Sequence, residues 1–130
     1  MPLTGGPTHV KVLIVDDIEN YVRSLQRALA AEWTTCCAHS VAEAKYLLES
    51  EQIDIALVDV RLSETDPQNR EGVELLKWIH TRYPDVPVIM MSAYQDFDAA
   101  VDALNLGAHQ FLKKPIDLRA LKEMLRSLVR

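Results

Sequence analysis

The sequence predicts a single α/β domain of the doubly wound type, with a five-stranded parallel sheet covered by helices on both faces. Two observations predict this fold. Five short, almost uninterrupted apolar runs, typical of strands buried on both faces, alternate with five segments of helical apolar spacing. This alternation favours right-handed crossovers between parallel strands. Residues 1–9 are rich in Gly and Pro and are expected to form a flexible tail, so residues 10–130 are expected to form the domain.

The sequence of the first half of this domain predicts two strand–helix units. β-branched apolar runs predict strands at residues 10–16 and 34–38. The apolar stripe of the helix between them is Ile18, Val22, Leu25 and Leu29. Ser40 and Glu43 form a capping box, which predicts the start of a second helix.

A third strand is predicted at residues 53–59, and residues 61–71 form a long polar loop after it. A helix follows the loop, with an apolar inner face. That face is Val73, Leu76, Ile79 and Tyr83. Pro84 and Pro87 bracket the turn into a fourth strand at residues 88–91.

The sequence of the last part of the chain predicts two helices and one strand between them. The fourth helix is lined by Phe97, Val101 and Leu104. Gly107 stands at its C-cap position, and residues 110–113 form the fifth strand. Asp117 caps the final helix. The apolar stripe of that helix is Leu118, Leu121, Leu125 and Leu128.

Polar residues stand at the carboxyl ends of four predicted strands. They are Asp16 and Asp17 after the first strand, Asp59 after the third, Ser92 after the fourth, and Lys113 and Lys114 after the fifth. An Asp at one strand end is more often a cap or a loop residue. Because the carboxyl ends of parallel strands share one edge, where open α/β folds bind ligands, their joint placement predicts a site.

Three carboxylates in one cleft repel each other, so the cluster implies a divalent cation. Hard oxygen ligands suit Mg²⁺, which commonly completes its shell with phosphate. A carboxylate can attack phosphorus to form an aspartyl phosphate, while an ammonium and a hydroxyl bind the phosphoryl oxygens. Ser92 supplies the hydroxyl, and helical and strand periodicity does not choose between Lys113 and Lys114 for the ammonium.

Composition and motifs exclude several other function classes. The net charge of −5 and the scattered basic residues argue against direct binding to nucleic acid or to an anionic membrane. No apolar segment approaches the roughly 20 residues that span a bilayer, so a cytoplasmic protein is expected. Neither the adjacent Cys36 and Cys37 nor the dispersed His residues form a metal-binding pattern. The glycine-rich motifs of dinucleotide sites and P-loops are missing from the sequence.

The ordered segments VLIVDD, ALVDVRL, VIMMSA and GAHQFLKKP resemble the receiver domain of bacterial two-component response regulators, over residues 10–130. The resemblance implies a flavodoxin-like fold with strand order 2-1-3-4-5. It makes Asp59 the phosphoacceptor and Asp17 a direct Mg²⁺ ligand. Asp16 would be a ligand directly or through water, and the backbone carbonyl of Arg61 a further one.

The same resemblance assigns the other site residues. Ser92 matches the hydroxyl residue that reaches for the phosphoryl group, and Ala93 the small residue that leaves access to it. Lys114 matches the family lysine, with a cis peptide bond to Pro115. Phe111 matches the aromatic switch residue, and it lacks a phenolic hydroxyl.

The sequence departs from the family pattern in the loop after Asp59. Ser63 stands where a Pro is common, and Gly72 comes several residues late, so the loop is enlarged. A tolerated surface insertion is one interpretation, and a lid or an extra contact surface is the other. The bulky Arg61 and Tyr94 would flank the path of the attacking water, which leads to the hypothesis that they slow hydrolysis of the phosphorylated Asp.

The function implied is that of a switch in a phosphorelay. A sensor histidine kinase or a histidine phosphotransfer protein would supply the phosphoryl group with Mg²⁺, and a downstream effector would bind the surface of the fourth helix, fifth strand and fifth helix. The cognate kinase, the output and a phosphorylation-dependent homodimer stay open. Two alternatives remain: a Mg²⁺-dependent phosphohydrolase with an Asp nucleophile, and a receiver-like module that is never phosphorylated. Arg61 stands where such a hydrolase needs an acid.

Overall fold

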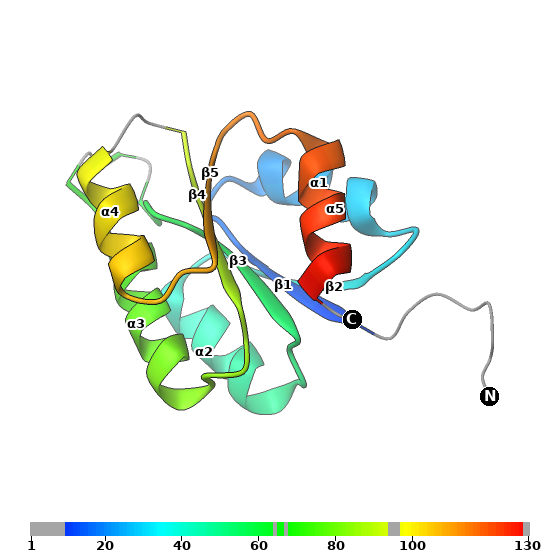
Figure 1. Ribbon diagram of the computed structural model, residues 1–130, viewed down its shortest axis with the longest axis horizontal. Coiled ribbons are helices and arrows are strands. Elements are labelled where there is room, and N and C mark those ends of the chain that lie inside the picture. Colours follow the sequence, from blue (N-terminus) through cyan, green and yellow to red (C-terminus); the bar gives the residue numbers. More distant parts are fainter. Residues whose placement is uncertain (1–9, 64, 67, 94–96, 129–130) are drawn as a thin grey trace.

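The computed structural model describes residues 10–63, 65–66, 68–93 and 97–128. It has three layers, with the sheet between α1 and α5 on one face and α2, α3 and α4 on the other (Figure 1). The strands are β1 (Lys11–Val15), β2 (Thr34–Ala38), β3 (Ile55–Asp59), β4 (Val88–Ser92) and β5 (Gln110–Lys113). The helices are α1 (Glu19–Leu29), α2 (Val41–Ser50), α3 (Glu71–Arg82), α4 (Phe97–Asn105) and α5 (Leu118–Leu128). The expected tail, residues 1–9, lies outside the described residues.

All strand pairs of the sheet are parallel, and the strand order is β2-β1-β3-β4-β5. The predicted doubly wound fold and its strand order are therefore confirmed. The predicted strand boundaries differ from the observed ones by at most two residues. No helix among the described residues has both the length and the apolar character needed to cross a membrane.

Strands β1, β3 and β4 are buried along almost their whole length, which explains their uninterrupted apolar runs. Successive side chains point to opposite faces of the sheet. In β1, Val12 and Ile14 pack with α1 and α5, whereas Leu13 and Val15 pack with α2, α3 and α4. The two core layers are thus built by alternate residues of the same strands.

The predicted helix caps are present. The Ser40 hydroxyl accepts a hydrogen bond from the Glu43 amide at 3.2 Å at the start of α2. The Asp117 carboxylate accepts hydrogen bonds from two amides in the first turn of α5. Gly107 has a φ of +102°, and its amide donates a hydrogen bond to the carbonyl of Leu104. The amide of Ala108 donates a hydrogen bond to the carbonyl of Ala103. This is the hydrogen-bond pattern of a glycine C-cap.

Helix α4 differs from the expectation. The apolar residues that define it in the sequence face outward, with exposed fractions of 79% for Phe97, 40% for Val101 and 47% for Leu104. Its buried side chains are Ala99 and Ala103. Small side chains let a helix approach its neighbours closely, so α4 packs on its alanine face and leaves its large apolar residues exposed.

Candidate functional site

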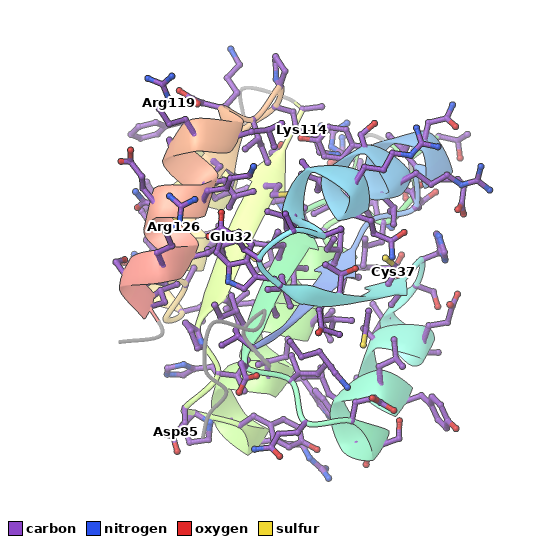
Figure 2. The ribbon with its side chains drawn as sticks, turned by 90° about the vertical axis from the view of Figure 1, so that its right-hand side faces the viewer. Glu32, Cys37, Asp85, Lys114, Arg119 and Arg126 are labelled. Atoms are coloured by element: carbon purple, nitrogen blue, oxygen red, sulfur yellow. The ribbon has the colours of Figure 1, made fainter. Side chains whose placement is uncertain are left out.

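The sheet brings the predicted site residues to one edge. Asp16 directly follows β1, Asp59 ends β3, Ser92 ends β4 and Lys114 directly follows β5. The register aligns these ends, because Asp59 lies opposite Met91, the residue before Ser92. The Lys114 amide donates to the Ser92 carbonyl at 2.8 Å, which continues the sheet pairing by one residue. Figure 2 shows Lys114 at the end of the sheet, far from the Asp85 turn.

Lys114 is the lysine that enters the acidic cluster. Its Nζ lies 2.6 Å from Asp16 Oδ2 and 3.3 Å from Asp59 Oδ2. Its exposed fraction is 9%, whereas Lys113 is exposed. The peptide bond between Lys114 and Pro115 is cis. The structure thus makes the choice between the two lysines that periodicity could not make.

Burial places the Asp59 carboxyl group in an environment that disfavours its charge. The exposed fraction is 0% for Asp16 and 5% for Asp59. Burial, followed by the negative charge of Asp16, raises the pKa of the Asp59 carboxyl to about 7 against the opposing effect of Lys114. Burial lowers the pKa of Lys114, but the hydrogen bond with Asp16 and the negative charges around the ammonium outweigh it and raise that pKa.

The three aspartates form a group that fits a metal ion. Asp16, Asp17 and Asp59 each offer a carboxylate oxygen, and these oxygens lie within 4.8 Å of one another. Asp16 Oδ1 also accepts a hydrogen bond from the Ile18 amide at 3.0 Å, which fixes the carboxylate at the start of α1. Hard oxygen donors of this kind suit Mg²⁺. The role of the Arg61 backbone carbonyl stays a prediction.

The other predicted site residues differ in how deeply they are buried. Ser92 is 1% exposed, whereas Ala93 is exposed at the surface. Phe111 is half-buried and packs against the core on the side of α2, α3 and α4. Tyr94 lies outside the described residues, so its predicted place beside the water path is a prediction still.

The start of α3 meets the strand that carries Asp59. A Cβ added to Gly72 would lie 1.9 Å from the backbone carbonyl oxygen of Asp59, so a side chain does not fit there. The Gly72 amide donates to the Val60 carbonyl at 2.9 Å. The position of Gly72 after the long loop is the sequence signal for this contact, although the sequence alone gives no reason for it.

The enlarged loop before α3 is tied to both of its ends and to α4. The Asn69 side-chain carbonyl accepts hydrogen bonds from the amides of Leu62 and Glu71, at 2.9 Å and 3.0 Å. Arg70 forms an ion pair with Asp102 of α4 at 3.1 Å. The loop therefore has specific contacts, including one with the helix that precedes β5.

One residue beside the site has no counterpart in the sequence expectations. The Lys114 Nζ lies 4.2 Å from the centre of the Tyr21 ring, on α1. Tyr21 lies in the first turn of α1, close in sequence to Asp16 and Asp17. That proximity was the available signal, but an aromatic residue beside an apolar stripe is normally interpreted as a core residue.

The comparisons with known proteins agree on one family. The sequence model of the response regulator receiver domain matches residues 12–126. The chain is 38% identical to the response regulator protein PilR of Pseudomonas aeruginosa, over 92% of this chain and 26% of PilR. It is 41% identical to the DNA-binding transcriptional regulator NtrC of Escherichia coli, over 82% of this chain and 22% of NtrC. The chain thus spans about a quarter of the length of these relatives.

Solved structures show the same architecture. A CheY-like receiver domain protein from Methanospirillum hungatei superposes with a TM-score of 0.82 at 28% identity, covering 92% of this chain and 93% of that one. The signal receiver domain of an HD domain-containing protein from Pseudomonas fluorescens gives a TM-score of 0.84 at 28% identity, covering 94% and 95% of the two chains. By its sequence and its fold, the chain belongs to the response regulator receiver domain family, the signalling domains of two-component systems.

Proposed function

We propose that this domain accepts a phosphoryl group on Asp59 and thereby acts as a conformational switch. The observation that carries the proposal is the position of the Asp59 carboxylate. It ends β3 at the ligand-binding edge of the sheet, beside the buried Lys114 ammonium at 3.3 Å and within 4.8 Å of the Asp16 and Asp17 carboxylates. A carboxylate nucleophile next to a cation and a metal-binding group is the arrangement that phosphoryl transfer requires.

Receiver domains bind Mg²⁺ at an acidic pocket, and the aspartate cluster of this chain is such a pocket. Asp16, Asp17, Asp59 and the Arg61 carbonyl would hold the ion. When bound, Mg²⁺ supplies positive charge that offsets the charge on the phosphoryl oxygens. The same charge offsets the repulsion among the carboxylates, which explains how three of them can share one buried site.

In the proposed transfer, an Asp59 carboxylate oxygen forms a bond to phosphorus as the bond between phosphorus and the donor breaks. With a phosphohistidine donor, the imidazole leaves and takes up a proton. Lys114 neutralises one phosphoryl oxygen, and the Ser92 hydroxyl donates a hydrogen bond to another. The exposed Ala93 leaves the approach to the carboxylate open on that side.

The switch that we propose follows from the new charge on Asp59. Ser92 and Lys114 are drawn towards the phosphoryl group, and because the Lys114 amide bonds to the Ser92 carbonyl, both strand ends respond together. Phe111 is half-buried on the neighbouring strand and can turn inward without losing a hydrogen bond, since its ring has none. The surface of α4, β5 and α5 would then change its shape.

The partners follow from this role. A sensor histidine kinase or a histidine phosphotransfer protein would supply the phosphoryl group, in the cytoplasm. A downstream effector, as a further domain or as a separate protein, would bind the switched surface. PilR and NtrC are much longer than this chain, and NtrC is named as DNA-binding. We propose that any contact with nucleic acid belongs to an effector and not to this acidic domain, whose net charge is −5. A phosphorylation-dependent homodimer would form through the same surface.

Mass spectrometry after treatment with acetyl phosphate and Mg²⁺ tests the proposal. The expected result is a hydroxylamine-sensitive phosphoryl adduct that maps to Asp59 and disappears in Asp59→Asn. The variant Asp54→Asn is the control, because Asp54 lies before the start of β3, where it accepts a hydrogen bond from the Lys11 amide. A wild-type protein without the adduct would contradict the proposed function and favour the module that is never phosphorylated. Multiple turnover of a phosphate ester would instead favour the phosphohydrolase.

A further inference from the structure

The Lys114 ammonium is a buried positive charge, and its contacts show which groups stabilise it. An ammonium has three N–H donors and no acceptor. The ammonium donates hydrogen bonds to two carboxylate oxygens, Asp16 Oδ2 at 2.6 Å and Asp59 Oδ2 at 3.3 Å. The face of the Tyr21 ring lies on a further side, with its centre 4.2 Å from Nζ. The side chains of Asp16, Asp59 and Tyr21 are thus partners of the ammonium.

A lysine ammonium is strongly hydrated in water, and burial removes that hydration. With an exposed fraction of 9%, Lys114 retains little access to solvent. An N–H group left without a partner in such a place is unfavourable. The negative face of an aromatic ring attracts a cation, and the attraction is stronger where water is excluded. The Tyr21 ring therefore takes the place that water holds around an exposed lysine.

Helix α1 holds the ring in this position. Tyr21 is half-buried and packs against the core layer that α1 and α5 share. Burial raises the pKa of the Tyr21 phenol against the opposing effects of the Lys114 charge and of a backbone hydrogen bond from Ile116. The phenol is therefore neutral at physiological pH, and the ring acts on the ammonium through its face and not as a counter-anion.

We propose that Tyr21 is a positioning residue for phosphoryl transfer: its ring keeps the Lys114 ammonium at the Asp16–Asp59 pair, ready to meet the incoming phosphoryl group. This inference rests on the proposed function of Asp59. An aromatic face attracts a cation with less directional demand than a carboxylate, so it supports Lys114 while the ammonium turns from Asp16 towards a phosphoryl oxygen. Without a ring at position 21, the Lys114 side chain adopts more conformers, and a smaller fraction of them is competent for the transfer.

The test compares ring-containing and ring-free variants in phosphorylation by acetyl phosphate at saturating Mg²⁺. Tyr21→Phe keeps the ring and is expected to react within about two-fold of the wild-type rate, whereas Tyr21→Leu is expected to react about five- to ten-fold more slowly. Tyr46→Leu is the matched control, because Tyr46 is 69% exposed on α2, and this variant is expected to react at the wild-type rate. Tyr21→Met is a second ring-free variant, used in place of the leucine variant if that variant does not fold.

A nuclear magnetic resonance signature separates positioning from general stability. The Lys114 side-chain methylene next to Nζ is expected to resonate upfield because of the Tyr21 ring current, in the wild type and in Tyr21→Phe, and to return towards the ordinary lysine position in the ring-free variants. A phosphorylated wild type with equally fast ring-free variants, or a resonance that the ring-free variants do not move, would overturn the inference alone. A wild type without the adduct would overturn the proposed function and this inference with it.

Discussion

The carboxyl group of Asp59 lies where its negative charge is unfavourable before a cation binds. Its pKa of about 7 in the folded protein compares with an ordinary value of 3.8. Between these two pH values the folded state binds more protons than the unfolded state. The free energy of unfolding therefore falls as the pH rises through this window, and the loss is complete above the folded pKa.

Removal of the Asp59 charge should relieve this penalty. In the absence of metal, Asp59→Asn is expected to be more stable than the wild type at pH 8, by on the order of 2 kcal/mol, and the difference should shrink as the pH is lowered towards 4. Thermal unfolding in a chelating buffer at several pH values measures this. Asp85→Asn, an exposed change in the turn before β4, is the control and should follow the wild type. A constant difference between Asp59→Asn and the wild type at all pH values would contradict the crowding of charge in the site.

The identity of the site residues could be predicted from their places at strand ends, because parallel strands deliver their carboxyl ends to one edge. Periodicity alone did not choose between Lys113 and Lys114, because the choice depends on side-chain direction past the end of β5. The resemblance to the receiver family assigned Lys114, and this is the lysine whose ammonium lies beside Asp16 and Asp59. Tyr21 was missed for a related reason. A single sequence shows that a residue is aromatic, but not that its ring faces an ammonium carried by a residue that is distant along the chain.

At the scale of elements, the approach of α3 to β3 depends on one glycine. The Cβ of an alanine at position 72 would overlap the Asp59 carbonyl oxygen, which belongs to the backbone and cannot turn away. At position 107 the added Cβ would meet the ring of His80, at 2.6 Å from its nearest atom, and this ring belongs to an exposed side chain and not to the backbone. The two glycines therefore serve different purposes, one for close packing and one for a positive φ.

Alanine substitutions should separate these purposes. Gly72→Ala is expected to lower the free energy of unfolding by about 3 kcal/mol and to slow phosphorylation of Asp59, because the backbone that carries the carboxylate must shift. Gly107→Ala should cost about 1 to 2 kcal/mol through its backbone conformation and leave the phosphorylation rate unchanged. Urea unfolding together with the acetyl phosphate assay measures both effects. Equal phosphorylation rates in the two variants would show that α3 does not fix the position of Asp59.

Helix α4 shows where the sequence pattern misled. An apolar stripe normally marks the buried face of a helix, but here Ala99 and Ala103 are buried while Phe97 is largely exposed. The pattern predicted the helix correctly and its orientation wrongly, because apolar spacing does not distinguish a core face from a face left for another contact. A helix with so small a buried face is weakly held by packing, and its ion pair with the enlarged loop then matters more.

The Arg70–Asp102 pair is the contact to test. Asp102→Asn is expected to change the free energy of unfolding by less than about 0.5 kcal/mol, because the pair is exposed to solvent. It should nonetheless speed the hydrogen exchange of α4 amides, while the amides of α1 keep their wild-type rates. Asp98→Asn, in the first turn of the same helix, serves as the control. Unchanged exchange in α4 of Asp102→Asn would show that the loop does not restrain the helix.

At the scale of the whole molecule, the two faces of the sheet are closed differently. On the face of α1 and α5, Arg126 near the end of α5 pairs with Glu32 in the turn before β2 (Figure 2). The Arg126 guanidinium also lies over the Trp33 ring. The opposite face holds α4 with its outward apolar residues. The site lies at the carboxyl edge of the sheet, between these faces, since Asp59 ends the central strand β3 and Ser92 ends its neighbour β4. A change at the site can therefore reach helices on both faces, including α4 and α5 of the switch surface that we propose.

Metal binding should stabilise this arrangement as a whole. With all groups ionised, three carboxylates and one ammonium leave an excess of negative charge in the site, and a bound divalent ion offsets it. Because a ligand that binds only the folded state raises stability by mass action, the melting temperature of the wild type should rise steadily with Mg²⁺ concentration at constant ionic strength. Asp17→Asn removes one carboxylate and should need at least about ten-fold more Mg²⁺ for the same rise, whereas the surface variant Asp85→Asn should match the wild type. Equal Mg²⁺ responses in wild type and Asp17→Asn would show that the ion stabilises the protein elsewhere, and the aspartate cluster would then lose its assignment as the metal site.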